Sequence, residues 1–425
     1  MQLYTEQPFR LWQLHSIKCN LFVFWILIYA MNYKKSLVFV SACAGMLLFG
    51  IVFLSLGTVL TFVRQQYDMS ELQVGSLTAL LPFGILAGSV VFGPVVDRYG
   101  YKQVLLGSTL FIFLAFEGIA YAGSLRVLQA AFLLIGFGGG IINGATNALV
   151  ADISPESKGA NLSLLGVFYG IGAVGMPVLL GLLSDKFPYA SIVAGIGIFV
   201  LLPFIFFLVV RFPVSKNSHG ISLKEVGRLF SAVLLLLGFV LFFESAVEGI
   251  ANNWATSFAL AVVTPENTFA LIALTLSNIS LVISRLLLGF ILVKVKPNTV
   301  LYFCWSCILA GSLTMYFVHT VAGLYTGMIL TGFGFGAGFP VILGYVGELY
   351  PGFTGTAFSI VITIALIGNT LINGLTGVIS QKYGVSHFPL VIVVCVILMM
   401  IIFAAAFKKM KLKIQSEGEV KEVMV

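Results

Sequence analysis

Charged residues are scarce in this sequence. Asp, Glu, Lys and Arg together make up 9% of the 425 residues, against roughly a quarter in an ordinary soluble domain. A soluble fold of this length could not cover its core with so few charges, so the composition excludes a soluble enzyme, a disordered chain and a nucleic-acid-binding protein. The few histidines all lie in a terminal segment or near expected loops, which argues against a histidine relay. They are His15, His219, His319 and His387.

Cysteine is also sparse, and its five positions form no disulfide framework. Cys304 and Cys307 form a C-x-x-C pair, but it lies inside an apolar stretch without a nearby histidine. We therefore expect these thiols to pack rather than to bind a metal. Because no nucleophile–base pairing, phosphate loop or metal-ligand spacing appears, we expect no enzyme activity, no metal and no organic cofactor.

Long hydrophobic runs are what the sequence has in abundance, since 59% of its residues are hydrophobic. A bilayer core about 30 Å thick needs about 20 apolar residues per helix. Polar residues separate twelve such stretches, the seventh of which is overlong and is expected to be broken or tilted. The stretches are 36–63, 72–96, 103–123, 127–151, 160–183, 189–210, 229–262, 268–292, 299–318, 322–347, 355–379 and 387–407.

The positive charges orient these spans. If span 1 starts inside the cell, the inner loops and the tail hold sixteen Lys and Arg residues, and the outer loops hold four: Arg64, Arg126, Lys186 and Lys382. This asymmetry is typical of a multi-pass inner-membrane protein whose two termini are cytoplasmic. The formal charge of +7 therefore reflects orientation in the membrane rather than an acidic partner.

The spans divide the chain into two halves of six, which predicts an all-α membrane protein. We expect an N-terminal extension (1–35), a six-helix bundle (36–210), a cytoplasmic linker (211–228), a second bundle (229–407) and a cytoplasmic tail (408–425). The apolar run 21–31 is too short to span easily. It is a signal-like segment, an interfacial helix or, as we favour, part of an extension that is not native, because Met31 opens MNYKKS just before span 1.

An internal repeat relates the two halves. When Gly93 is placed on Gly289, the segment 93–186 aligns with 289–382 without a gap. The G-F-G run at 136–138 matches the one at 332–334, Pro155 matches Pro351, and Ser163 matches Ser359. An even number of spans per repeat makes the halves parallel, which predicts two pseudo-symmetric bundles with a substrate site between them.

The loop between spans 2 and 3 reads GPVVDRYGYK and contains Gly93, Asp97 and Arg98. It resembles the signature loop of the major facilitator superfamily, which implies twelve helices in two bundles and transport by alternating access. We expect a charged conformational latch at the inner surface, with Asp152 near Arg98 and Glu348 near Lys294 or Arg285. The latch residues are Gly93, Asp97, Arg98, Asp152, Arg285, Lys294 and Glu348.

Three segments, 136–150, 242–258 and 284–301, resemble the fucose/glucose/galactose permease family. The resemblance implies transport of a monosaccharide, often coupled to protons or sodium. Asn143 stands where that family commonly has a glutamate, and span 1 carries no acid. These two departures put proton coupling through the N-terminal half in doubt.

Acidic groups inside spans usually mark a pathway or a pair. Glu244, Glu248 and Asn252 recur every four residues in span 7 and are expected to share one helix face. Glu248 corresponds to the permease family's span 7 glutamate. Because desolvation favours a protonated carboxyl group, Glu248 and Glu244 are candidates for ion coupling. A hydrogen bond to a neighbouring span is the alternative role.

Amide side chains are expected to contact the solute, because they both donate and accept hydrogen bonds, as sugar hydroxyls require. They recur at a spacing of four in spans 4 and 11. Trp254 would stack on a sugar ring, and interhelical packing is the alternative for all of these side chains. The expected substrate-binding residues are Asn143, Asn147, Glu248, Asn252, Asn253, Trp254, Asn369 and Asn373.

These patterns predict a secondary active transporter for a small neutral solute, a monosaccharide, in the bacterial-type inner membrane. The coupling ion is a proton or sodium, or the protein is an uncoupled facilitator, and we expect a monomer. Efflux of amphipathic compounds is an alternative that the many phenylalanines permit. A non-transporting sensor would need a signalling tail, whereas residues 408–425 contain no domain.

Overall fold

The computed structural model describes residues 33–214, 227 and 229–423. The described chain is helical throughout and contains no strand. Its helices are α2 (Lys35–Gln66), α3 (Glu71–Tyr99), α4 (Tyr101–Ala120), α5 (Leu125–Ile153), α6 (Lys158–Leu183), α7 (Tyr189–Val209), α9 (Ala232–Phe258), η1 (Ala259–Val263), α10 (Asn267–Ile291), α11 (Pro297–Phe317), α12 (Val321–Gly334), α13 (Gly338–Leu349), α14 (Thr354–Tyr383), η2 (Val385–His387) and α15 (Phe388–Val423).

Twelve segments of the described chain are long and apolar enough to cross a bilayer, and they overlap the twelve stretches expected from the sequence. The seventh span, expected to be broken or tilted, is not broken, because α9 runs on directly into the π-helix η1; its tilt stays a prediction. The break lies in the tenth span instead, where residues 335–337 separate α12 from α13. Glycines at every second position from 332 to 338 explain it, since each costs a helix interior about 1 kcal/mol.

Local signals in the sequence set several helix ends. The Ser70 hydroxyl accepts a hydrogen bond from the Gln73 backbone, and the Gln73 side chain accepts one from the Ser70 backbone, which is a capping box at the start of α3. Ser231 caps α9 in a similar way. Gly100 and Gly384 have φ of 82° and 90° where α3 and α14 end, a left-handed conformation that favours glycine.

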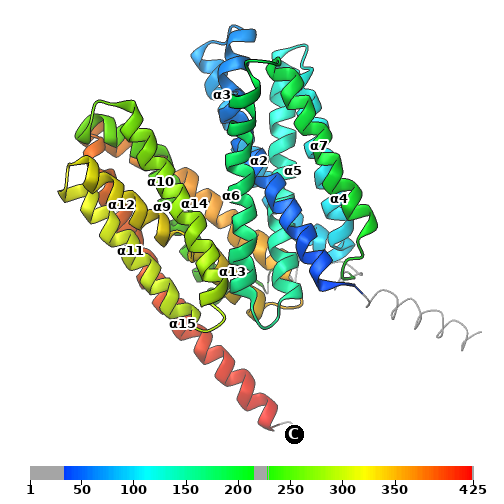
Figure 1. Cartoon of the computed structure of the whole chain (residues 1–425). Helices are drawn as coiled ribbons and strands as arrows, with labels where there is room; N and C mark the ends of the chain where they lie inside the picture. The colour runs from blue at the N-terminus through cyan, green and yellow to red at the C-terminus, as the bar shows by residue number, and fades with distance from the viewer. Residues whose placement is uncertain (1–32, 215–226, 228, 424–425) are drawn as a thin grey trace, which may run out of the picture.

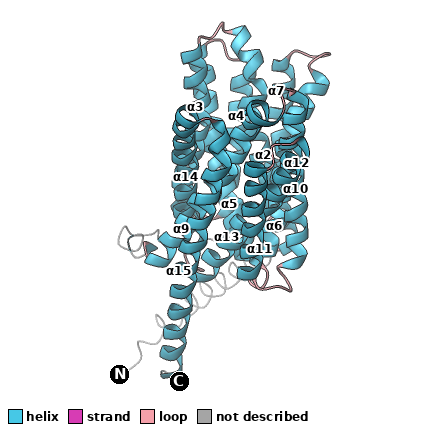
Figure 2. Cartoon of the chain, turned by 90° about the vertical axis from the view of Figure 1, so that its left-hand side faces the viewer, coloured by secondary structure: helices cyan, strands magenta, loops and turns pink. Residues whose placement is uncertain are grey.

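The helices form two bundles that lie side by side (Figure 1). α2 to α7 make the N-terminal bundle, in which α5 packs against α2, α3 and α4. α9 to α15 make the C-terminal bundle, in which α9 packs against α14 and α15. The C-terminal part of α15 continues past the rest of the bundle as a helix (Figure 2), so residues 408–423 of the expected tail extend the last span. Residues 1–32 and most of the expected linker lie outside the described chain.

The repeat found in the sequence is also a repeat of contacts. Gly136 of α5 packs against the Leu81 carbonyl of α3, and Gly332 of α12 packs against the Ser277 carbonyl of α10. Both members of the second pair are related to those of the first by the offset that aligns the two halves. Gly138 packs on Ser108 and Ile112, and Gly334 packs on Cys304 and Ile308, again at that offset. The two bundles therefore place corresponding helices in corresponding positions.

Candidate functional site

The hydrogen bonds between the two bundles, among the residues that the structure describes, lie at one end of the molecule. We call this the closed end; it comprises the last turns of α3, α5 and α10 and the first turns of α6 and α14, together with α13. The ribbons diverge from it toward the opposite end (Figure 1). The bonds connect 89–97, 152 and 163–166 in the N-terminal bundle with 285 and 354–359 in the C-terminal bundle.

Asp97 is the centre of one closed-end contact and is only 4% exposed. Its carboxylate accepts hydrogen bonds from the Gly355 N–H (3.2 Å), the Thr356 N–H (2.8 Å) and the Thr356 hydroxyl (2.7 Å). A carboxylate at a helix N-terminus satisfies free N–H groups and interacts well with the helix dipole. Gly93, one turn earlier, packs directly on Gly355 and Ser359. These two expected latch residues therefore join α3 to the start of α14.

The other latch residues have different partners from those expected. Asp152 accepts hydrogen bonds from the Tyr101 hydroxyl (2.6 Å) and the Thr354 hydroxyl (2.7 Å), while the Arg98 guanidinium lies over the ring of Tyr99. The expected pairing of Asp152 with Arg98 is therefore replaced by hydroxyl contacts, because α4 and α14 place their hydroxyls at this carboxylate.

The expected pairing of Glu348 also differs. The charge that acts on Glu348 is Lys158 at the start of α6, and the Lys158 side chain passes beside Gly347. Lys294 lies exposed in the turn after α10. Pairing of Glu348 with Lys294 or Arg285 was expected from the spacing within one half, whereas the basic residue near Glu348 in the structure is Lys158 of the other bundle.

Arg285 lies buried between the bundles, at 7% exposure. Its Nη1 donates to the Gly166 carbonyl of α6 (3.2 Å), and its guanidinium lies 5.8 Å from the centre of the Tyr169 ring. Its own carbonyl accepts from the Ser163 hydroxyl (2.9 Å). Within the described residues its Nε has no hydrogen-bond partner. Arg285 therefore joins α10 to α6, with a neutral carbonyl rather than a carboxylate as its acceptor.

Glu248 lies near the same junction. The charges of Glu248 and Arg285 both act on the Tyr169 hydroxyl of α6, and the charge of Arg285 acts on Glu248. Glu248 belongs to α9, Arg285 to α10 and Tyr169 to the opposite bundle. The Arg285 guanidinium therefore lies over the Tyr169 ring across the two bundles, and the Glu248 carboxyl group lies within electrostatic range of both.

Glu244, one turn before Glu248, has a different hydrogen-bond partner, although the charges of Glu248 and Arg285 reach it. It is 1% exposed, and its Oε2 accepts a hydrogen bond from the Trp305 Nε1 of α11 (2.9 Å). Glu244 thus lies on the same side of α9 as Glu248 but bonds to α11, which is the alternative role of a hydrogen bond to a neighbouring span. Successive residues at a spacing of four drift by about 40° around a helix, and this drift turns Glu244 toward α11 and α13.

Amide side chains gather in the C-terminal bundle on α9, α10 and α14. Asn253 donates to Asn373 (3.1 Å), and Asn278 lies 3.5 Å from Asn252. Asn369 donates to the Ser245 carbonyl (2.8 Å), and Asn373 donates to the Asn369 carbonyl (2.9 Å). We call these five side chains the amide cluster. Asn278 is the one member outside the expected set of substrate-binding residues.

The N-terminal bundle has an amide pair of its own. Asn147 donates to the carbonyl (2.8 Å) and to the side-chain oxygen (3.1 Å) of Asn143 on α5. The hydrogen bonds of the described chain join this pair to neither Glu248 nor the amide cluster. Trp254 lies against Gly377 of α14, so its ring takes part in the packing of α9 on α14.

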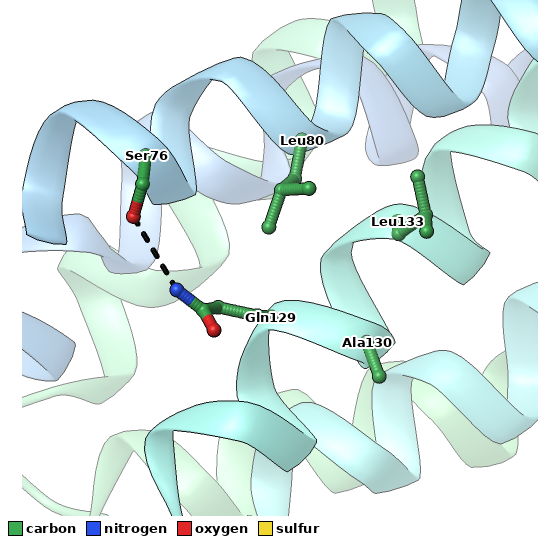
Figure 3. Close-up of a pocket in the computed structure, with 5 residues that line it drawn as sticks. All are labelled: Ser76, Leu80, Gln129, Ala130 and Leu133. Carbon is green, nitrogen blue, oxygen red and sulfur yellow. Dashed lines mark hydrogen bonds between the residues drawn. The ribbon is translucent and has the colours of Figure 1, made fainter.

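A pocket of about 280 Å³ lies between α3 and α5, lined by Ser76, Leu80, Gln129, Ala130 and Leu133 (Figure 3). Gln129 donates to the Ser76 hydroxyl across it (3.3 Å). The pocket is near the starts of α3 and α5, away from the closed end. Asn143 stands fourteen residues farther along α5, or about 21 Å, so this pocket is separate from the amide groups.

Several residues at these junctions went unnoticed in the sequence: Gly166, Tyr169, Thr356 and Trp305. Each is an ordinary residue type within an apolar helix, and its role depends on a partner from another helix. The repeat could have indicated Ser163 and Ser359, which it aligns. The described residues contain no cluster of three or more metal-ligating side chains.

Twelve apolar helices in two repeated bundles, joined at one end and carrying polar groups where they face each other, define a multi-pass membrane transporter. The chain matches the Major Facilitator Superfamily model over residues 37–323. It is 22% identical over 340 residues to the glucose/mannose transporter GlcP of Bacillus subtilis (strain 168), covering 77% of this chain and 84% of that protein.

Two solved structures share the fold. FucP in the outward conformation gives a TM-score of 0.75 at 18% identity and covers 87% of this chain and 98% of its own. The proton:xylose symporter XylE gives 0.72 at 14% identity and covers 88% and 95%. The chain belongs to the major facilitator superfamily, a family of transporters.

Proposed function

We propose that this protein imports a neutral monosaccharide by alternating access, in symport with a proton or sodium. The similarity to a glucose/mannose transporter over most of both chains supports a sugar as the solute. The fold shared with FucP and XylE supports the same transport cycle. The coupling ion would act at Glu248, because this carboxyl group lies within electrostatic range of Arg285 and Tyr169 where the two bundles meet.

The amide cluster is the observation that carries this proposal. Its side chains come from three helices of one bundle and are bonded mainly to one another and to backbone carbonyls. Amides present both donors and acceptors, which neutral hydroxyl groups require. Asn143 and Asn147 on α5 would supply contacts from the other bundle once the bundles close around the solute. A site of this chemistry suits a sugar better than a charged or wholly apolar compound.

The conformation described here is the outward-facing state in this proposal. The closed end carries the loops rich in Lys and Arg, so we assign it to the cytoplasm of a bacterial inner membrane, with both termini on that side. Because the bonded contacts between the bundles lie at that end, the opposite end is the one that admits the solute. Rocking about the solute would then open the cytoplasmic side. We propose that the monomer is the transporting unit.

Uptake into proteoliposomes tests the proposal. Purified protein is reconstituted with an imposed inward proton or sodium gradient and offered a panel of labelled monosaccharides. We expect saturable uptake of at least one sugar, competition by its epimers, and reduced uptake at low sugar concentration in Asn373→Leu. Gln129→Leu is the matched control, because it removes an amide in the separate pocket. Indifference to the whole panel, or extrusion of amphipathic dyes instead, would overturn the proposal.

A further inference from the structure

Glu244 is a buried acid that the proposed solute site does not use. Its Oε2 is held by the Trp305 indole, whereas its Oε1 has no hydrogen-bond partner among the described residues. Trp305 is itself fully buried and is fixed by Phe403, whose ring lies 5.3 Å away. An unpaired negative charge in such a place is very costly, whereas a neutral acid is tolerated.

The carboxyl group lies against the start of α13, just after the break in the tenth span. A Cβ atom at Gly338, the first residue of α13, would overlap the Glu244 carboxyl carbon. The other side of the break is fixed to α10, because Ser284 donates to the Phe333 carbonyl (2.7 Å) and Ser280 to the Ile329 carbonyl (2.8 Å). The Glu244 carboxyl thus touches α13, the side of the break that these two bonds do not hold.

α13 also forms part of the closed end. Gly344 and Gly347 pack on Gly159, Lys158 and Ala151 of the opposite bundle. While the closed end is intact, α13 is therefore held between α6 and Glu244. When the bundles part at this end, α13 loses its contact with α6 and can pivot at residues 335–337.

We propose that Glu244 is a second protonation site, occupied in the closed-end state and emptied when α13 moves. The proton resides on Oε1 and passes to water that reaches the carboxyl group once α13 pivots. Lower pH therefore favours the closed-end state, because that state binds one more proton. This inference rests on the proposed transport cycle, but it specifies a switch at the tenth span rather than a contact with the solute.

A proton fits this position better than a metal cation. The groups around the carboxyl are an indole N–H and a helix N-terminus, both of which present positive dipoles, and Gly338 leaves no room for a larger ion. The titratable groups that act on Glu244 or sense it are Glu248 on α9, Arg285 on α10 and Cys304 on α11. Farther along the helices packed against α9 stand Tyr345 and Glu348 on α13, Lys382 and Tyr383 on α14, His387 on η2, and Cys395, Lys408, Lys409 and Lys411 on α15.

The test measures closure of this end directly, without any solute. Spin labels at Glu156 and Val293, exposed residues of opposite bundles at the closed end, report the distance between the bundles in nanodiscs as pH is varied. The labels are placed in a background without the native cysteines. We expect the closed population of the otherwise unmodified protein to rise as pH falls. Glu244→Gln, which mimics the neutral acid, should stay closed at every pH, whereas Glu117→Gln, which removes an acid of α4 in the other bundle, should still respond.

A second variant separates protonation from a packing role. Trp305→Phe removes the donor to Oε2 but keeps an aromatic ring, so it should move the midpoint of closure upward by about one pH unit. An unchanged pH response in Glu244→Gln, or a midpoint unaffected by Trp305→Phe, would overturn the inference. So would closure that follows sodium concentration but not pH. Because no sugar is present, a failed uptake panel leaves this result standing.

Discussion

Ser163 and Ser359 occupy matching positions of the internal repeat and make the same hydrogen bond in opposite bundles. Ser163 donates to the Arg285 carbonyl (2.9 Å), and Ser359 donates to the Ser89 carbonyl (2.6 Å). The two acceptors, Ser89 and Arg285, are related by the same offset as the two donors, so the repeat places two matching bonds across the interface. The side chains at the acceptor positions break the symmetry, because only Arg285 reaches on to Gly166.

We predict that Ser163→Ala and Ser359→Ala weaken the closed end by similar amounts, about 1 kcal/mol each. The two bonds share no partner, so the double variant should show the sum of the single effects. The closed population, measured by spin-label distances, gives the comparison. A double variant no weaker than either single variant would show that the two bonds do not act independently.

Asp97→Asn should slow the transport cycle more than it weakens solute binding. The neutral amide loses the attraction to the start of α14 and can accept through only one oxygen, so the closed end becomes less stable. We expect a fall in turnover with a nearly unchanged dissociation constant, measured by uptake and by calorimetry. Thr356→Val is the matched control, since it removes one donor and keeps the carboxylate. Wild-type turnover in Asp97→Asn would contradict the proposal that the Asp97 contact stabilises the closed end during the transport cycle.

Glu248→Gln should abolish accumulation of the solute and spare exchange. The amide keeps the size of the side chain but cannot lose a proton or neutralise Arg285. Loading proteoliposomes with unlabelled solute and following the entry of labelled solute measures exchange, and an imposed ion gradient measures accumulation. If accumulation persists at the wild-type level, the coupling ion acts elsewhere.

Asn373→Leu should raise the KM for the transported sugar by roughly tenfold, equivalent to about 1.4 kcal/mol, with a smaller effect on turnover. The change leaves Asn253 and Asn369 without one partner each. Asn161→Leu is the control, because that amide bonds to Ser154 and Ser157 near the closed end. Equal effects of the two changes on KM would point to a general loss of folding rather than to solute contact.

Gly338→Ala should destabilise the protein by about 1–3 kcal/mol, because the added methyl group overlaps the Glu244 carboxyl. The double variant Gly338→Ala/Glu244→Ala should recover part of this loss, since the smaller side chain at 244 makes room. Thermal unfolding in detergent measures both. Absence of any recovery would indicate that the strain at Gly338 comes from the backbone rather than from Glu244.

The sequence by itself determined the number of spans and the existence of two related halves. A bilayer requires long apolar helices, so each span is visible as a continuous apolar run. The relation between the halves is visible as a constant offset between matching glycines, prolines and serines. The loop motif that contains Asp97 also identified part of the contact between the bundles, because its residues lie next to one another in the sequence.

The tertiary structure alone decided which residues meet. It placed the Tyr101 and Thr354 hydroxyls at Asp152, brought Lys158 of the other bundle near Glu348, and placed the helix break in the tenth span. It also separated Glu244 from Glu248, which differ in the sequence only by one helical turn. Such choices depend on the rotation of each helix and on partners far away in the sequence. When a helix is apolar on nearly every side, its hydropathy pattern does not indicate which side faces a neighbouring helix.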